Sequence, residues 1–366
     1  MSLKVALLTP GYPPTTGGIE TVVGGLAPAL SMRGLEVEIW THDKTISAPK
    51  THLDGDVVVR SFPTTRSHRF PLSYTLWQHV RRFGPKMDVL HAHSYHASPA
   101  LSTLRSMQTP LVFSPHYHGG GHTPLAKLVH VPYRPFGRKL FGHASAVVAD
   151  SVAEMELIRS HFPGTIDRTQ VICCAADAAE IHRAMPFDDA APTLLSLGRL
   201  EAYKGVDRVL AAFAATSIPG KFVIVGGGPD LERLKGLVAA HPRRDDIQLL
   251  GKIDREDVNR WLRTARCVVS MSNLEAFGLV GLEGAAAGAH VVLSDIPSYR
   301  EVAGLAPAGQ TTLVPLTSSS SEADLVKALE IAMSKPNVGP QPIRSWTDAA
   351  EEFAALYERV AHRIKV

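Results

Sequence analysis

Two glutamates in an apolar segment are the residues whose types and spacing most clearly suggest chemistry. The stretch LEAFGLVGLEG, residues 274–284, carries Glu275 and Glu283 eight positions apart and contains no basic residue. A carboxylate among apolar side chains needs polar partners, because burying an unpaired charge is costly. Sugar hydroxyls could bind one acid and a ribose diol the other. On spacing alone, however, two surface or capping acids are the simpler interpretation.

A strand followed by a helix would position these two acids. The run CVVSMS at 267–272 predicts a buried strand, and we expect a helix to begin near Gly278. The amides of the helix start would then form an anion site. Eight residues of partly helical chain span on the order of 10 Å, roughly the length of a sugar–diphosphate–ribose unit. The segment predicted to contact sugar and phosphate comprises Ala276, Phe277, Gly278 and Leu279.

Two basic residues are predicted at the same edge of the same sheet. The motif GRLEAYKG places Arg199 and Lys204 directly after the predicted strand TLLSL. A guanidinium and an ammonium could stabilise the charge that builds on a departing diphosphate, although a solvated basic loop has the same composition. The glycine turn VGGGP at 225–229, with Gly227 at its centre, suits either close approach of a ligand or simply a tight turn.

The N-terminal half offers a second glycine turn and a group of histidines. Gly17 and Gly18 in GYPPTTGGIE would start a helix that could contact phosphate or sugar. The turn is not GxGxxG, which disfavours a dinucleotide-dependent oxidoreductase. Strand residues two apart share a face, and no cysteine or carboxylate pattern completes a zinc site, so we expect no metal site. Of the histidines, we expect His116 to lie closest to the ligand; the group is His91, His93, His96, His116, His118 and His122.

Length and patterning predict an α/β protein of two domains. The chain has 366 residues, and its net charge of +3 is too small to indicate a nucleic-acid partner. Thirteen short β-branched runs alternate with helical patterns, which indicates two doubly wound parallel sheets with ligands at the carboxyl ends of their strands. We expect an N-terminal domain at 1–180, a C-terminal domain at 181–344 and a last helix at 345–366. Gly24, Gly25 and Pro28 weaken the first helical pattern.

The lack of a recognisable signal peptide and the small number of cysteines lead us to expect a cytoplasmic protein. The start MSLKVALLTPGYPP has too short an apolar run for a signal peptide, and no window reaches the length of a membrane span. The three cysteines, Cys173, Cys174 and Cys267, do not form a disulfide framework, and we expect them to serve packing.

Taken together, these motifs resemble the retaining GT-B glycosyltransferases of family 4. The segments PPTTGGIETVV, LVFSPHYHG, LGRLEAYKGVDRVLAAF, VIVGGGPDLERL and EAFGLVGLEGAAAGAHVVLSD follow in the family's order and cover nearly the whole chain. Glu275 and Glu283 match the family's E-x7-E element. The resemblance implies two Rossmann-like domains facing a cleft, a nucleotide-diphosphosugar donor, retention of anomeric configuration, and no metal or other cofactor. One departure is CCAAD at 173–177, where many members have a Pro-Asn-Gly turn.

The resemblance also implies roles for the individual residues. Arg199 and Lys204 would stabilise the departing diphosphate, Glu275 would hold the transferred sugar, and Glu283 would hold the ribose. Gly17 and Gly18 would cover the diphosphate, and His116 would line the reaction centre. The last helix would cross back to the N-terminal domain.

The sequence leaves the reaction type and the acceptor open. An epimerase or a glycosyl phosphorylase of the same fold, or a non-catalytic nucleotide-sugar binding module, would share most of these residues. The acceptor is also open: a small molecule, a glycan or a lipid-linked sugar. The segment KLVHVPYRPFGRKLFGH, residues 127–143, mixes basic and aromatic residues, which suits either peripheral membrane contact or, more simply, a solvated amphipathic helix.

Overall fold

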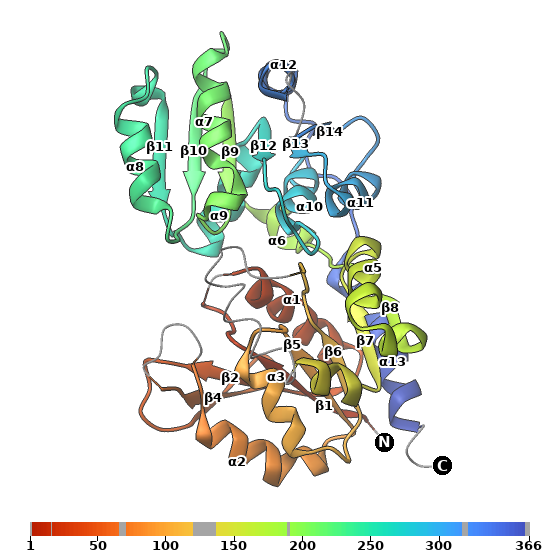
Figure 1. Cartoon of the computed structure of the whole chain (residues 1–366). Coiled ribbons are helices and arrows are strands. Elements are labelled where there is room, and N and C mark those ends of the chain that lie inside the picture. The colour runs from red at the N-terminus through yellow and green to blue at the C-terminus, as the bar shows by residue number, and fades with distance from the viewer. Residues whose placement is uncertain are drawn as a thin grey trace. The chain divides into compact units, whose positions relative to one another are not determined.

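The computed structural model shows two compact α/β units (Figure 1). It describes residues 2–15, 17–65, 71–119, 137–188, 191–316 and 321–362. The first unit comprises residues 1–174 and 346–366, and the second comprises residues 175–345. No helix in these described ranges is both long and apolar enough to span a bilayer.

The sheet of the first unit is parallel except at one edge. Its strand order is β3-β4-β2-β1-β5-β6-β7-β8, and only β3 runs antiparallel, against β4. The strands are β1 Lys4–Thr9, β2 Glu36–Asp43, β3 Lys50–Asp54, β4 Val57–Pro63, β5 Val89–His93, β6 Leu111–Ser114, β7 Ala146–Ala149 and β8 Thr169–Val171. β3 was not predicted from the sequence, because all five of its residues are exposed and it lacks the apolar run of a buried strand.

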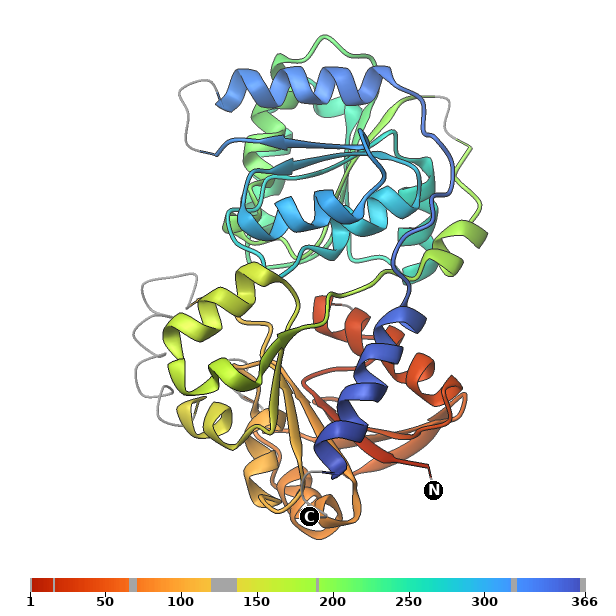
Figure 2. The ribbon, with the colours of Figure 1, turned by 90° about the vertical axis from the view of Figure 1, so that its right-hand side faces the viewer.

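Helices surround this first sheet. The described ones are α1 Gly18–Met32, α2 Tyr74–Phe83, α3 Ser98–Ser102, α5 Val152–His161 and α13 Trp346–His362, with short 3-10 helices η1 Gly84–Lys86, η2 Thr103–Arg105 and η3 Pro163–Arg168. α2, α3 and α5 flank a core that includes Trp40, Leu76 and Phe113. The last helix α13 packs on α1 and β5, as Figure 2 shows for α1, so it belongs to the first unit although it ends the chain.

The second sheet has the strand order of a Rossmann fold. Its order is β11-β10-β9-β12-β13-β14, all parallel, which is 3-2-1-4-5-6 counted within the unit. The strands are β9 Thr193–Leu197, β10 Lys221–Val225, β11 Ile247–Gly251, β12 Cys267–Ser270, β13 His290–Ser294 and β14 Thr311–Val314. The strand order reverses between β9 and β12: the chain builds the sheet outward from β9 toward one edge and from β12 toward the other. Ligands of such sheets bind at this switch point, beyond the carboxyl ends of the strands.

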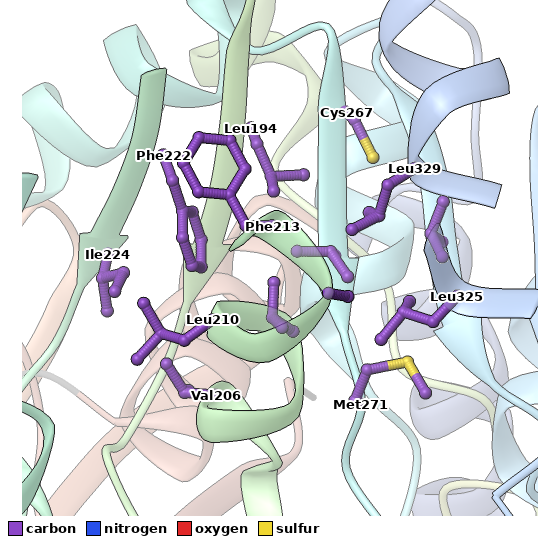
Figure 3. Close-up of a cluster of buried hydrophobic side chains, with 14 of the residues drawn as sticks. Leu194, Val206, Leu210, Phe213, Phe222, Ile224, Cys267, Met271, Leu325 and Leu329 are labelled. Carbon is purple, nitrogen blue, oxygen red and sulfur yellow. The ribbon is translucent and has the colours of Figure 1, made fainter. Parts of the chain in front are cut away.

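Helices cover both faces of the second sheet. They are α6 Ala178–Arg183, α7 Val206–Ala215, α8 Leu231–Ala239, α9 Arg255–Thr264, α10 Leu279–Ala286, α11 Pro297–Leu305 and α12 Ser321–Ser334, with η4 Ala202–Lys204 and η5 Arg244–Asp246. On one face, Val206, Leu210 and Phe213 of α7 pack with Leu194 of β9 and Leu329 of α12 (Figure 3). On the other, α9 and α10 contribute Leu262 and Ala286 to a separate core.

The contacts place the boundary between the units at residue 174, whereas the sequence placed it at residue 180. Cys174 is buried beside Asp150 of the first unit. Asp177 caps α6 by accepting a hydrogen bond from the Glu180 amide at 3.0 Å, and α6 packs on α9 and α10. The CCAAD segment therefore spans the boundary.

Glycine at position 25 has a packing reason that the sequence did not reveal. Helix α1 is continuous through Gly24, Gly25 and Pro28. A Cβ atom at Gly25 would lie 2.2 Å from Nε1 of Trp346, the first residue of α13. The missing side chain thus makes room for the indole and lets α13 approach α1.

We predict that Gly25→Ala destabilises the first unit, because the methyl group would displace Trp346. Overpacking of this kind costs on the order of 1–3 kcal/mol, more than the helix propensity that alanine adds. The matched control is Gly236→Ala in α8, where a Cβ atom meets no atom within 4 Å. Scanning calorimetry should show a lower melting temperature for Gly25→Ala and an unchanged or higher one for Gly236→Ala. Equal stability of both variants would contradict this account.

Candidate active site

The loops after β9 and β12 carry the central residues of the candidate site. The β9 loop leads through Arg199 and η4 to Gly205, which caps α7 at a φ of 68°. A Cβ atom at Gly205 would lie 2.4 Å from the Met271 carbonyl oxygen of the β12 loop. The Asn273 amide donates to the Tyr203 carbonyl at 2.9 Å. These contacts fix the two loops against each other at the reversal point of the sheet.

An ion pair joins the two loops through their side chains. Lys204 Nζ donates to Glu275 Oε1 at 2.5 Å, with the side chains 21% and 14% exposed. Burial opposes the lysine charge, but Glu275, Tyr203 and Glu201 together outweigh that effect and raise the pKa of Lys204. The lysine is therefore charged near neutral pH. In the part of the chain that the structure describes, the second oxygen of Glu275, Oε2, has no protein partner.

Arg199 lies near this pair but makes a different contact. Its Nε lies 2.8 Å from Glu201 Oε1, and its side chain is 70% exposed. Burial raises the pKa of Tyr203, and the charges of Lys204, Glu275, Glu201 and Arg199 also act on it. The four charged groups are therefore close to one phenol ring. Arg199 is the most solvent-accessible of the predicted cations of this site.

The helix after Glu275 begins where the sequence predicted. α10 starts at Leu279, and Gly278 precedes it in a left-handed conformation with a φ of 107°. The amides of Leu279 and Val280, its first two residues, have no carbonyl partner within the helix, whereas the Gly281 amide donates to the Gly278 carbonyl at 3.0 Å. Phe277 is buried, which holds the turn in place. The helix start thus presents backbone N–H groups beside the Lys204–Glu275 pair.

Glu283 lies one turn further along α10 and has its own basic partner. Its side chain is 6% exposed, and Oε1 lies 2.7 Å from Nη2 of Arg255, the first residue of α9. Burial opposes the charge of Arg255, whereas Glu283 raises the pKa of the guanidinium. The two acids of the motif therefore do not share one cation. Each is paired with a base from another loop.

Sequence reasoning missed Arg255 and Tyr299, which contact the two acids. Arg255 follows β11 and its capping residue Asp254. Tyr299 follows β13 in the first turn of α11, and its Oη lies 3.2 Å from Glu275 Oε1. Both come just after the carboxyl ends of parallel strands, which is where ligand-site residues of such sheets gather. Applying that rule to every strand would have identified them.

The glycine turn after β10 has a structural explanation. Cβ atoms at Gly226 and Gly228 would lie 1.8 Å and 2.1 Å from the carbonyl oxygens of Gly198 and Leu200, respectively. The Leu200 amide donates to the Gly227 carbonyl at 3.0 Å. These glycines let the β10 loop lie against the β9 loop. Contact between Gly227 and a ligand stays a prediction.

In the first unit, the glycine turn and His116 follow separate strands. A Cβ atom at Gly17 would lie 2.2 Å from Glu20 Oε2, whereas one at Gly18 would meet no atom within 4 Å. The Glu20 carboxylate thus lies at the start of α1. His116, with a left-handed φ of 48°, lies directly after β6 with Nδ1 2.6 Å from Asp150 Oδ2.

Two more buried histidines extend this arrangement. His93 Nδ1 lies 3.1 Å from His116 Nε2, so both ring nitrogens of His116 have protein partners. Burial lowers the pKa of His93 well below its usual value, which keeps that ring neutral. His91 forms hydrogen bonds with Ser114 and with the Tyr357 hydroxyl of α13 instead.

Among the described residues, no three His, Cys, Asp or Glu side chains are grouped closely enough to hold a metal ion. His122 lies outside the described residues.

The basic and aromatic segment at 127–143 is described only from residue 137. Lys127, Tyr133, Arg134 and Phe136 lie outside the described residues. Arg138 and Lys139 are exposed, whereas Phe141 is 1% exposed and belongs to the core of the first unit. Phe141 therefore cannot contribute to a membrane-facing surface, contrary to the membrane interpretation of this segment.

Family models match both halves of the chain. Residues 16–180 match the model of Glycosyltransferase Family 4, and residues 177–342 match that of Glycosyl transferases group 1. Among curated proteins, the phosphatidyl-myo-inositol mannosyltransferase of Mycobacterium leprae is 28% identical, with 98% of this chain and 97% of that protein covered.

Solved glycosyltransferase structures share the fold over the full length. The sucrose-phosphate synthase of Thermosynechococcus elongatus superimposes with a TM-score of 0.73 at 19% identity, covering 99% of this chain and 97% of that one. Anabaena HepE in complex with UDP-glucose gives a TM-score of 0.69 at 17% identity, covering 99% and 98%. The fold is GT-B, with two Rossmann-like parallel-sheet domains. The chain is a glycosyltransferase with the GT-B fold, whose two halves match the models of Glycosyltransferase Family 4 and of Glycosyl transferases group 1.

Proposed function

We propose that this enzyme transfers a hexosyl group from a nucleotide-diphosphosugar to an acceptor hydroxyl, with retention of configuration. The observation that carries the proposal is the Lys204–Glu275 pair at the start of α10. A largely buried ammonium, a carboxylate whose Oε2 has no partner among the described residues, and a set of backbone amides together match the groups of a diphosphosugar. The UDP-glucose bound to HepE supports a donor of this class.

Each part of the donor has a partner in this arrangement. The diphosphate would bind the α10 amides and Lys204, since an anion is stabilised at a helix N-terminus. Oε2 of Glu275 would accept hydrogen bonds from sugar hydroxyls. Glu283 would accept hydrogen bonds from the ribose while Arg255 balances its charge. Arg199, whose side chain is exposed, would reach the phosphate from solvent.

The chemistry would depend on positioning and electrostatics. The bond from the anomeric carbon to the phosphate oxygen breaks as the bond to the acceptor oxygen forms on the same face. The acceptor proton passes to the leaving phosphate oxygen, so no protein nucleophile is needed. The negative charge on the diphosphate is stabilised by Lys204 and Arg199. We propose that these two cations make a metal ion unnecessary, and that His116, Gly17 and Gly18 of the first unit also take part in binding the donor.

A ligand screen combined with one variant tests this function. Thermal unfolding with UDP-glucose, GDP-mannose and ADP-glucose should show a raised melting temperature for one donor, because binding stabilises the folded state. Lys204→Ala should lower kcat for transfer to a sugar acceptor by about 10²–10³-fold, since it removes charge stabilisation of the leaving group. We expect a comparable loss for Glu275→Ala.

Lys235→Ala is the matched control, because Lys235 forms an exposed pair with Glu232 on α8. It should turn over the donor at the wild-type rate. Binding of none of the three donors would refute a nucleotide-sugar site of this class. Full activity of Lys204→Ala would refute the role assigned to the ion pair. Product formation from donor without any acceptor would indicate an epimerase instead.

The second acid–base pair is predicted to affect binding more than turnover. Arg255→Met leaves Glu283 buried without its cation, so we expect KM for the donor to rise by about tenfold with kcat nearly unchanged. Glu283→Ala should likewise raise KM for the donor and leave kcat nearly unchanged. Because the two residues contact each other, the double variant should lose less than the product of the two single effects.

Arg260→Met on the same helix is the control for this pair. The Arg260 side chain is exposed to the same extent as that of Arg255, but it pairs with Asp257 at 3.5 Å instead of with Glu283. Steady-state kinetics should show its KM unchanged. A loss in kcat alone for Arg255→Met, or strict additivity in the double variant, would be inconsistent with the ribose-binding role.

A further inference from the structure

Tyr299 is a fully buried residue that has no role in the transfer chemistry above. It lies in the first turn of α11, directly after β13, and its side chain is 0% exposed. A phenol is a polar group, and its complete burial requires hydrogen-bond partners. Tyr299 has two, and both belong to the β12 segment that leads to the candidate site.

The phenol oxygen of Tyr299 lies between Glu275 and Ser270. It is 3.2 Å from Glu275 Oε1 and 2.6 Å from Ser270 Oγ. Burial, followed by the effect of the Glu275 carboxylate, raises the pKa of Tyr299 well above its usual value, so the hydroxyl keeps its proton. A phenol has one proton, and the carboxylate can only accept. Tyr299 therefore donates to Glu275 and accepts from Ser270.

The ring of Tyr299 contacts the start of α10. A Cβ atom at Gly278 would lie 2.2 Å from Cε1 of the ring and 2.7 Å from Cδ1. Gly278 also has a φ of 107°, which side chains rarely adopt. The ring thus fills the space that a side chain at position 278 would take. One residue touches both the sugar-binding carboxylate and the phosphate-binding turn of the proposed site.

Lys204 and Tyr299 donate to the same oxygen of Glu275. A donor diphosphate would attract the lysine, because the two phosphates together carry about two negative charges and the carboxylate carries one. Tyr299 is neutral and buried, so the diphosphate does not compete for it. After Lys204 has moved, the phenol is the donor that continues to hold Oε1, and Oε2 remains available to the sugar.

On these grounds we propose that Tyr299 is a positioning residue, which fixes the Glu275 carboxylate for the sugar and supports the Gly278 turn for the diphosphate. The inference rests on the proposed function, because it acts through Glu275 and α10. It predicts two separable effects: the hydroxyl serves recognition of the sugar, and the ring serves recognition of the diphosphate.

Titration calorimetry on two variants separates these effects. The probes are the pairs UDP and UDP-glucose, GDP and GDP-mannose, and ADP and ADP-glucose, and the pair that wild type binds best is used. Tyr299→Phe removes only the hydroxyl. Its Kd for the nucleotide sugar should rise by about tenfold, the effect of one hydrogen bond to a charged group, while its Kd for the nucleoside diphosphate stays within about twofold of wild type. Tyr299→Leu removes the ring as well, and both dissociation constants should rise.

Tyr357→Phe is the control for loss of a buried tyrosine hydroxyl. Tyr357 is 0% exposed and bonds His91 at 2.7 Å in the other unit. Its melting temperature should fall as in Tyr299→Phe, but its ratio of the two dissociation constants should equal that of wild type. Equal losses for nucleotide and nucleotide sugar in Tyr299→Phe, or no loss, would overturn the proposal while leaving the proposed function intact. If wild type binds none of the pairs, the proposed function fails first, and the role of Tyr299 fails with it.

Discussion

The candidate site depends on an ion pair between two loops that leave the second sheet in opposite directions. Lys204 comes from the loop after β9, and Glu275 comes from the loop after β12. The strand order 3-2-1-4-5-6 makes β9 and β12 neighbours and sends their following segments to opposite faces. Residues 71 positions apart in the chain can therefore meet at one sheet edge. In a largely buried charge pair, the loss of either partner leaves the other charge poorly solvated and unpaired, so the pair constrains both loops.

Glycines and a tyrosine complete this constraint. Gly205 lets the β9 loop approach Met271, and Gly226 lets the β10 loop approach Gly198. Tyr299 supports Glu275 from the side of α11. The result is a closely packed arrangement in which we propose that Lys204 is the group that moves to a bound diphosphate. Preorganised charges of this kind stabilise a leaving group without reorganisation during the reaction.

Much of this arrangement could be predicted from the sequence, for identifiable reasons. The apolar runs predicted the buried parallel strands, and the glycine before Leu279 predicted where α10 begins. The exposed β3 has no such signal, so it was missed. The motif residues Lys204 and Glu275 were assigned to one site, but their direct contact was not foreseen. Arg255 and Tyr299 were missed because each meets its acid only through the fold, and sequence spacing does not encode that meeting.

The central claim is that Lys204 exchanges its carboxylate partner for the donor diphosphate. The most direct test is the position of Lys204 Nζ in a crystal structure of the protein with the nucleoside diphosphate that binds best. The account predicts a phosphate oxygen at about 3 Å from Nζ, at the start of α10, with Glu275 still bonded to Tyr299. A diphosphate bound away from α10, with the Lys204–Glu275 pair unchanged at its present 2.5 Å, would contradict it.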